Sequence, residues 1–409
     1  MHEAKKKYSF GFVLTLMFAA SALSCMLLTV LFLFYVGYGN ADGSGYANEN
    51  ENETGIFDEL MRVVETRFIG AYDISELTDE AMRAAIEALD DDWSYYMSPS
   101  EYADFMANSN NQYRGIGVEV LMDEETEGMK VVRVYENSGA DLAGIIADDI
   151  VVAVDGQSII GLTLTEIRTL LRREIGETAV VTVIRDNTEY IDLTVEYNIV
   201  FTNPVSFEMM DGNIGYVRLR NFEEGAAWRF ANAVSDLIDD GAVAFIYDVR
   251  SNNGGRVGEV TAILDFLLPE GEIFISVDRG GTEQITYSDE YKIDFPAVVL
   301  VNNYSFSGAE YFAAMLSEYE YAATVGEPTT GKNRMQTTIP LTNGGAVHIS
   351  TGHYLTKNRI SLFDEGGFTP DYVIEMTDEE RSLYYRGELT PDIDTQLQKA
   401  LSLLQNIIN

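Results

Sequence analysis

Residues 297–336 read AVVLVNNYSFSGAEYFAAMLSEYEYAATVGEPTTGKNRMQ, and this stretch decides the fold class. The apolar run Ala297–Val301 has the length and β-branched content of a buried strand, and a polar turn follows it. Beyond Ser307 the apolar residues recur at helical spacing, at Phe312, Met315, Leu316 and Tyr319. A strand, a turn and a helix in this order predict one unit of an α/β sheet.

Ser307 falls at the predicted start of the helix. Unpaired backbone N–H groups and the helix dipole favour a developing negative charge there, which suits a nucleophile that creates an oxyanion. A lone serine at a helix start is more often an N-cap, and a lone loop lysine such as Lys332 is usually a solvated charge. The catalytic interpretation therefore depends on finding the two residues together.

Between Ser305 and Lys332 the chain resembles the C-terminal processing (tail-specific) serine proteases, which pair a serine nucleophile with a lysine base. The family's Ser-x-Ser run, its Gly-Lys pair and the glutamine that follows are all present in register. The resemblance implies that Ser307 is the nucleophile, that Lys332 is the base and that Gln336 orients the lysine amine. It implies no metal and no organic cofactor.

The same resemblance implies an oxyanion hole. In the family its backbone N–H groups come from the residue after the nucleophile and from a glycine of an Asn-Pro-Gly-Gly loop. These positions are Gly308 and Gly254 here, with Gly255 as the neighbouring alternative. A plain Gly-Gly turn that leads into a helix is the competing interpretation of this loop.

Three residues depart from the family pattern. Ala309 stands in place of its third serine, Asn333 in place of the glycine after the lysine, and Asn253 in place of the proline in the glycine loop. None of these changes removes a reacting group. They motivate a second hypothesis from another class, a membrane-tethered PDZ scaffold or adaptor that does not catalyse.

Two other chemistries fit less well. Residues 326–332 nearly match a phosphate-binding P-loop, but Asn333 stands where that motif needs Ser or Thr. The only histidines are His2, His348 and His353, and no Gly-x-Ser-x-Gly elbow is present. Lysine is therefore the most economical base.

The composition limits the classes of partner. A chain of 409 residues with 46% hydrophobic residues can build two or three domains with a substantial core. A formal net charge of −39 argues against nucleic-acid binding, which needs clustered Lys and Arg. Such an acidic surface suits a salty or cation-rich exterior.

Residues 1–40 predict a membrane anchor. Lys5, Lys6 and Lys7 precede an uncharged, mostly apolar run over 8–38, which exceeds the roughly 20 residues that span a bilayer. The basic flank predicts a cytoplasmic N-terminus and an extracytoplasmic remainder. A cleaved signal peptide is the alternative, although the run is long for one. Cys25, the only cysteine, lies in this run, so no intramolecular disulfide forms.

Beyond the anchor we expect three further segments before the catalytic domain. Residues 41–55 are rich in Gly, Asn and Glu and predict a flexible tether. Residues 56–111 carry two amphipathic helical patterns. Leu89–Tyr96, within that region, resembles the family's Leu-Asp-x-x-Ser-x-Tyr signature; its aspartates lack the alternation of a calcium loop.

Residues 112–197 resemble a PDZ domain. The resemblance implies that the turn formed by Gly115, Ile116 and Gly117 receives the terminal carboxylate of a peptide through backbone N–H groups. A capping box, Thr163 and Glu166, opens the predicted helix of this domain. A small β-rich domain without a ligand is the alternative.

Residues 198–409 alternate predicted strands and helices, which predicts an α/β domain. The resemblance implies that this domain is the serine peptidase core, of the crotonase-like or Clp-protease-like kind. The sequence thus predicts a single-pass membrane protein with an extracytoplasmic serine endopeptidase domain and an inserted PDZ domain. Its substrates would be proteins or peptides with exposed C-termini. A regulatory partner and homo-oligomerisation are left open.

The orientation can be tested on intact cells. Protease added outside should degrade the segments beyond residue 40 and spare the N-terminus, because Lys5–Lys7 hold that end in the cytoplasm. Epitope tags at the two ends, followed by immunoblotting, measure both outcomes. A C-terminal tag that survives until the cells are lysed would contradict the orientation.

Overall fold

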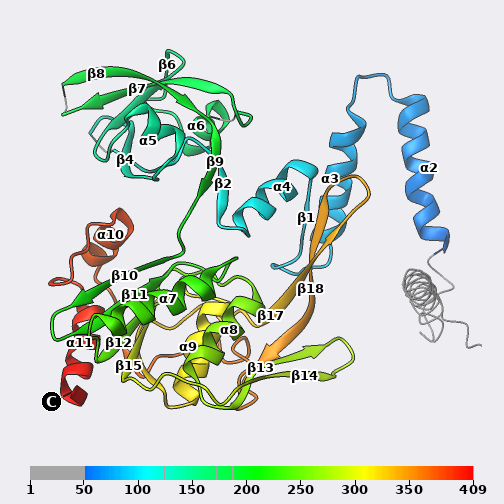
Figure 1. Ribbon diagram of the computed structural model, residues 1–409. Helices are drawn as coiled ribbons and strands as arrows, with labels where there is room; N and C mark the ends of the chain where they lie inside the picture. Colours follow the sequence, from blue (N-terminus) through cyan, green and yellow to red (C-terminus); the bar gives the residue numbers. More distant parts are fainter. Residues whose placement is uncertain (1–50, 124, 172, 187, 409) are drawn as a thin grey trace, which may run out of the picture. The chain divides into compact units, whose positions relative to one another are not determined.

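The computed structural model describes residues 51–123, 125–171, 173–186 and 188–408 (Figure 1). The predicted membrane span over 8–38 lies outside these residues. Among the helices that are described, none has the length and apolar character needed to cross a bilayer. The chain divides into two compact units, one up to Ile74 and one from Ser75 onward, and each is described by itself.

The first unit contains α2 (Glu51–Arg67), which confirms one predicted amphipathic helix. The helix begins within the predicted 41–55 tether, so that prediction is wrong for its last residues. In the described part of the chain, the apolar side chains of Phe57, Leu60 and Val63 on α2 are exposed to solvent.

The second unit begins with a helical region. After α3 (Ile74–Glu87) comes the short strand β1 (Tyr95–Met97), and then α4 (Pro99–Asn108). A capping box of Ser98 and Glu101 starts α4. β1 joins the sheet of the catalytic core, so the signature around Trp93 is carried to that core.

Residues 112–201 form a β-rich domain with a hydrophobic core of its own. β2 (Gln112–Gly115) pairs with β9 (Asn198–Phe201) at the point where the chain enters and leaves. The main sheet has the order β3-β4-β5-β7-β8, and β6 pairs with β5. Its other elements are β3 (Val118–Met122), β4 (Met129–Val134), α5 (Gly139–Ala143), β5 (Ile150–Val154), β6 (Gln157–Ser158), α6 (Leu164–Leu170), β7 (Thr178–Arg185) and β8 (Glu189–Glu196). The predicted capping box of Thr163 and Glu166 is present at α6.

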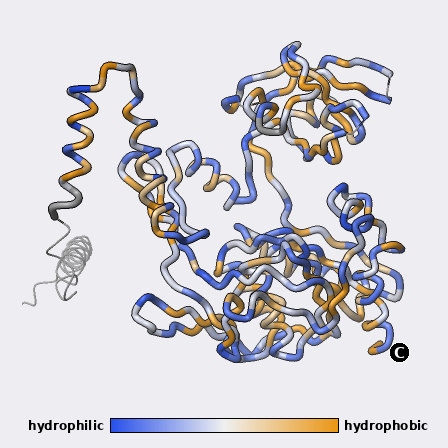
Figure 2. Tube along the Cα trace, turned by 180° about the vertical axis from the view of Figure 1, so that it is seen from behind, coloured by the Kyte–Doolittle hydropathy of each residue, from blue (hydrophilic) through white to orange (hydrophobic). Residues whose placement is uncertain are grey.

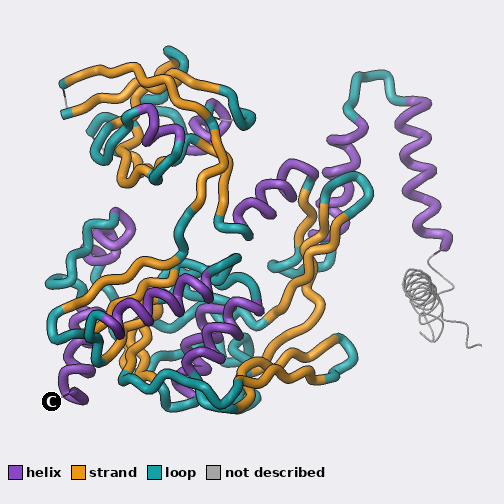
Figure 3. The backbone as a smooth tube through the Cα atoms, viewed as in Figure 1, coloured by secondary structure: helices purple, strands orange, loops and turns teal. Residues whose placement is uncertain are grey.

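The α/β core is built on a six-stranded sheet of order β10-β11-β12-β15-β16-β19 (Figures 1 and 3). All neighbouring strands run parallel except β10, which is antiparallel to β11. The strands are β10 (Val205–Met210), β11 (Ile214–Leu219), β12 (Ala244–Asp248), β15 (Ala297–Val301), β16 (Ala322–Gly326) and β19 (Tyr372–Val373). This confirms the predicted α/β class.

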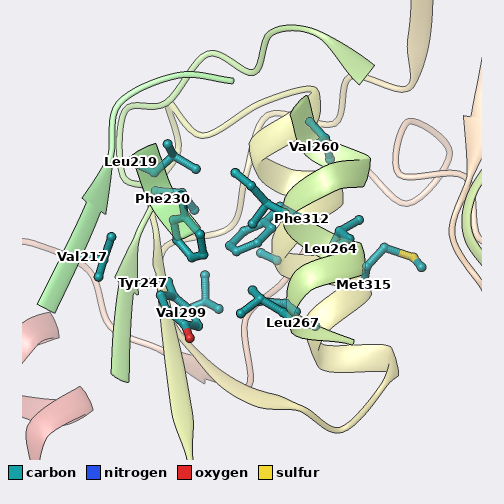
Figure 4. Packing of buried hydrophobic residues seen from close by; sticks show 14 of the residues in the cluster. Val217, Leu219, Phe230, Tyr247, Val260, Leu264, Leu267, Val299, Phe312 and Met315 are labelled. Carbon is teal, nitrogen blue, oxygen red and sulfur yellow. The ribbon is translucent and has the colours of Figure 1, made fainter. Parts of the chain in front are cut away.

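Helices cover both faces of the sheet. A large buried cluster unites residues of α7 (Ala226–Asp239), α8 (Val257–Leu267) and α9 (Gly308–Glu318) with the sheet, and Phe230, Tyr247 and Phe312 meet in it (Figure 4). A separate cluster packs α11 (Thr395–Ile408) against other residues of the same strands. Figure 2 shows hydrophobic and hydrophilic residues alternating along the chain in this core, as expected for elements with one buried face. Every residue of 309–316 is buried, which fixes α9 firmly.

A second sheet, of order β1-β18-β13-β14 with β17 paired to β18, completes the core. Its further strands are β13 (Gly271–Asp278), β14 (Glu283–Ser288), β17 (Arg334–Pro340) and β18 (Ala346–Leu355). The helix α10 (Asp378–Arg386) follows later in the chain and precedes α11. Because β17 directly follows Lys332, this sheet places the predicted base.

A buried ion network ties α11 to the end of β12. The Arg250 guanidinium contacts Asp248 at 2.6 Å and Asp394 at 2.9 Å, and all three side chains are buried. The Arg250 charge helps to lower the pKa of Asp248 against the opposing effect of burial. The loop that carries Gly254 and Gly255 follows directly, so this network anchors its base.

Arg250→Leu should destabilise the core by about 3–5 kcal/mol, because it leaves two buried carboxylates without their cation. Urea denaturation measures the free energy of unfolding. As a control, Lys292→Met removes an exposed ion pair with Asp294 and should cost less than about 1 kcal/mol. Equal effects of the two substitutions would show that the buried network does not hold the core.

Candidate active site

Ser307 lies in a sharp turn between β15 and α9, as the N-cap residue of the helix. Its backbone has φ 57° and ψ −121°, a conformation that a residue with a Cβ rarely adopts. Such strain persists only where the surroundings impose it, and it is common at functional sites. The buried helix that follows and the preceding strand supply that constraint.

The loop after β12 packs directly against this turn. Phe306 N–H donates to the Asn252 carbonyl at 3.1 Å, and Ser305 Oγ donates to the Val249 carbonyl at 2.8 Å. A Cβ added to Gly254 would lie 2.8 Å from Gly308 N, so only glycine permits the approach. β12 and β15 are adjacent parallel strands, and both loops therefore leave the same edge of the sheet.

The geometry corrects one oxyanion assignment. The Gly254 N–H donates to Asn252 Oδ1 at 2.8 Å and is not available to a substrate. Gly255 forms a parallel bridge with Phe222 in which the flanking peptides make both hydrogen bonds, so its own N–H points to the other side. Among the described residues, the N–H groups of Gly255 and Gly308 have no acceptor, and both residues line a cavity beside Ser307.

Lys332 and Ser307 line one cavity of about 580 Å³. Burial lowers the pKa of Lys332 to about 8, while the negative charges of Glu310 and Asp91 act in the opposite direction. The lysine amine lies 4.3 Å from the centre of the Trp93 ring. In the described part of the chain no hydrogen bond joins it to Ser307 Oγ, and a proton transfer would require the amine to turn.

Glu310 connects the two predicted catalytic residues through their backbones. Its carboxylate is fully buried, and Oε1 accepts from Ser307 N–H at 2.8 Å and from Lys332 N–H at 2.7 Å. Oε2 accepts from Gly331 N–H at 2.8 Å and from Thr329 Oγ at 2.7 Å. Burial raises the pKa of Glu310, and these four donors counteract that effect.

The sequence carries a local signal for the position of Glu310. It follows Ser307 at the spacing of a capping box, in which a glutamate accepts from the N-cap backbone. Tyr354 was also assigned no role. Its hydroxyl donates to the Lys332 carbonyl, it lines the cavity, and burial raises its pKa well above the usual value. Tyr354 pairs with β13, and no local pattern showed which way it would face.

Gln336 lies at a β-bulge of β17 and lines the same cavity as Lys332. Its Nε2 donates to Ser350 Oγ at 3.1 Å. No hydrogen bond between Gln336 and the lysine amine occurs among the residues described. Its orienting role therefore stays a prediction, with only its place in the cavity established.

The histidines contribute no partner to Ser307 in the described structure. His348 lines the cavity, its Nδ1 lies 2.8 Å from Thr338 Oγ1, and burial lowers its pKa to about 4. An imidazole with so low a pKa is a weak base. His353 pairs with β13 and β17 and does not line the cavity as described. His2 lies outside the described residues.

The predicted carboxylate-binding turn forms the wall of a second cavity. Gly115, Ile116 and Gly117 line a space of about 820 Å³ together with apolar residues such as Val118 and Leu171. The Gly117 backbone has φ 91°, in the region that favours glycine. The N–H groups of Ile116 and Gly117 find no acceptor in the described part of the chain. This arrangement suits a ligand with an apolar end and a negative charge.

Comparison with known proteins finds matches to both domains. Residues 213–374 match the model of peptidase family S41, and residues 130–185 match a PDZ domain model. The carboxy-terminal processing protease CtpA of Bacillus subtilis is 28% identical over 358 residues, which are 85% of this chain and 76% of that protein. The chloroplastic carboxyl-terminal-processing peptidase 1 of Arabidopsis thaliana is 30% identical over 306 residues, 72% of this chain and 62% of that protein.

A solved structure assigned to the S41 proteases, from Bacteroides fragilis, has the same fold. Its TM-score is 0.54 at 16% identity, and the match covers 87% of this chain and 98% of that chain. The resemblance that was predicted from residues 305–332 is confirmed. The chain belongs to peptidase family S41, as a carboxyl-terminal processing peptidase with a PDZ domain.

Proposed function

We propose that this peptidase cleaves polypeptides with Ser307 as nucleophile and Lys332 as general base. The observation that carries the proposal is the half-buried lysine, whose pKa is lowered to about 8, in one cavity with a strained serine at a helix start. A lysine with its ordinary pKa would be charged and unable to accept a proton near neutral pH.

In the proposed reaction the neutral Lys332 amine takes the proton of Ser307 Oγ as the oxygen attacks the scissile carbonyl. The negative charge that develops on the carbonyl oxygen is held by the N–H groups of Gly308 and Gly255. Protonated Lys332 then gives its proton to the leaving amine, and the C–N bond breaks. Water, deprotonated by Lys332, releases the acyl group and regenerates the serine.

The surrounding residues have supporting roles in this proposal. Glu310 fixes the Ser307 and Lys332 backbones relative to each other. Gln336 orients the amine once it has turned from Trp93 toward Ser307, which requires it to exchange its present bond to Ser350. The small apolar space beside Ser307, lined by Val257, Val260 and Phe274, receives a substrate side chain.

We further propose that the PDZ domain binds the exposed C-termini of substrates and that the enzyme acts outside the cytoplasm, tethered by residues 8–38. The free N–H groups of the Gly115–Gly117 turn support the first part, and the basic flank of the apolar run supports the second. The competing hypothesis is a non-catalytic PDZ scaffold. It is favoured by one observation: among the described residues, the lysine amine forms no hydrogen bond with Ser307 Oγ.

A serine-directed fluorophosphonate label on the segment 51–409 distinguishes the two functions. We expect rapid labelling of the parent protein and none of Ser307→Ala, together with cleavage of an unstructured protein by the parent alone. Equal labelling of both proteins, or a parent that cleaves nothing, would favour the scaffold.

The pH dependence tests Lys332 as the base. Activity should rise with pH along one limb centred near 8, because only the neutral amine accepts a proton. Lys332→Ala should abolish cleavage, and Lys332→Arg should not restore it, since a guanidinium stays charged. Initial rates of peptide hydrolysis over a pH series provide the measurement. If His348→Ala removed activity and Lys332→Ala kept it, histidine would be the base.

The lowered pKa of Lys332 also makes the stability of the fold depend on pH. The unfolded chain, with a lysine pKa near 10.5, binds more protons than the folded chain between about pH 8 and 10.5. This group therefore destabilises the fold fully below pH 8, and the cost disappears as the pH rises through that window. The pH limb of activity and this change in stability share one origin.

Recognition of the C-terminus is testable on inactive Ser307→Ala protein. A peptide with a free carboxylate and an apolar last residue should bind more tightly than its amidated form, because amidation removes the charge that the turn receives. Fluorescence anisotropy of labelled peptides measures the two affinities. Equal affinities would sink the carboxylate-binding role of Gly115, Ile116 and Gly117.

A further inference from the structure

We propose that Trp93 is a positioning residue for Lys332, whose indole ring holds the lysine amine against an apolar wall and keeps water from it. The inference deepens the proposed function, since it rests on Lys332 being the base. Trp93 belongs to the helical region far ahead of the catalytic core in the sequence, in a signature to which no chemistry was assigned.

Two aromatic rings enclose the amine. The Trp93 ring centre lies 4.3 Å from Lys332 Nζ, and the Phe306 ring centre lies 5.9 Å from it. The two rings are themselves 6.0 Å apart. Phe306 directly precedes Ser307, so the wall that holds the base also contacts the turn that holds the nucleophile.

The segment that carries Trp93 is firmly attached to this site. Asp91 accepts from Arg334 at 3.1 Å, and Ser94 Oγ accepts from Ser350 N–H at 3.0 Å. β1 then pairs with β18 from Tyr95 to Met97 (Figure 1). These bonds reach both strands that follow Lys332, so the backbone that carries the indole is held beside the loop that carries the amine.

Trp93 acts on the lysine and not on the substrate. As described, the cavity that contains Ser307 is lined by Lys332 but not by Trp93. A substitution at Trp93 should therefore change the protonation and position of the base while leaving substrate contacts in place. This separates it from residues such as Tyr95 and Phe105, which line the cavity.

The charges around the amine determine what removal of the ring should do. Glu310 from α9 and Asp91 from the segment before β1 both favour the ammonium form, although Arg334 from β17 offsets Asp91. His348 and Tyr354 from β18 are neutral near pH 8. Burial is the effect that opposes the two carboxylates and is the largest influence on the amine. Trp93 also attracts the ammonium form through its ring face, and this effect on the pKa of Lys332 is smaller than the effect of burial.

The first experiment measures the pH dependence of peptide cleavage by Trp93→Ala. Water admitted to the site should move the midpoint of the limb upward by about one pH unit and lower activity at neutral pH about tenfold. Raising the pH beyond the new midpoint should recover most of the lost activity, which a merely damaged fold would not do. KM for the peptide should change little.

Two variants serve as controls. Trp93→Phe keeps an aromatic ring beside the amine and should shift the midpoint less than Trp93→Ala. Trp228→Ala removes the other tryptophan, which is 66% exposed on α7, and should leave the pH profile unchanged. A Trp93→Ala limb that coincides with the wild-type limb, or that moves to lower pH, would overturn the proposal.

A second experiment does not depend on catalysis. The chain has only two tryptophans, so Trp228→Phe leaves Trp93 as the sole indole reporter. Its emission should titrate near pH 8 as the neighbouring amine gains its proton, and Lys332→Met should abolish this transition. A transition that persists in Lys332→Met would overturn the contact. If the parent protein cleaves nothing but this titration is seen, the proposed function fails while the Trp93–Lys332 contact stands.

Discussion

A single buried carboxylate sets the geometry of the active site. Glu310 accepts hydrogen bonds from the backbones of Ser307, Gly331 and Lys332, and so joins the helix start to the loop that ends in the base. The backbones of Ser307 and Lys332, the proposed nucleophile and base, are therefore held by hydrogen bonds to one carboxylate, independently of whether their side chains meet. This arrangement leaves the lysine side chain free to change position while the loop that carries it stays fixed.

The site also shows how a strained conformation is maintained. Ser307 keeps its positive φ because the helix after it is packed on all sides and its N–H is tied to Glu310. The glycine loop lies against the same turn, at a distance that no larger residue would allow. Three separate constraints thus hold Ser307 in one unfavourable backbone conformation. The packing of the core, rather than contacts of the Ser307 side chain, offsets the free energy of this strain.

The sequence could predict that Ser307, Lys332 and Gln336 meet at one site because a strand, a helix and these residues lie in one continuous stretch, and the structure places all three around one cavity. The oxyanion assignment failed at Gly254 because successive peptide groups point in opposite directions, and the side chain of Asn252 decides which one is occupied. The roles of Trp93 and Tyr354 were invisible for another reason. Both depend on the second sheet, whose pairing joins segments that are distant along the chain and carry no shared local pattern.

The buried network around Arg250 has a consequence for the order in which the enzyme is made. Arg250 opens the loop that carries Gly255, and it is held by Tyr384, Asp394 and Gln396, which are synthesised much later. A nascent chain that has exposed its serine and its lysine still lacks these partners. The loop that carries Gly255 gains these anchoring contacts only after synthesis has passed residue 396, so an unfinished chain lacks the network that holds the base of this loop.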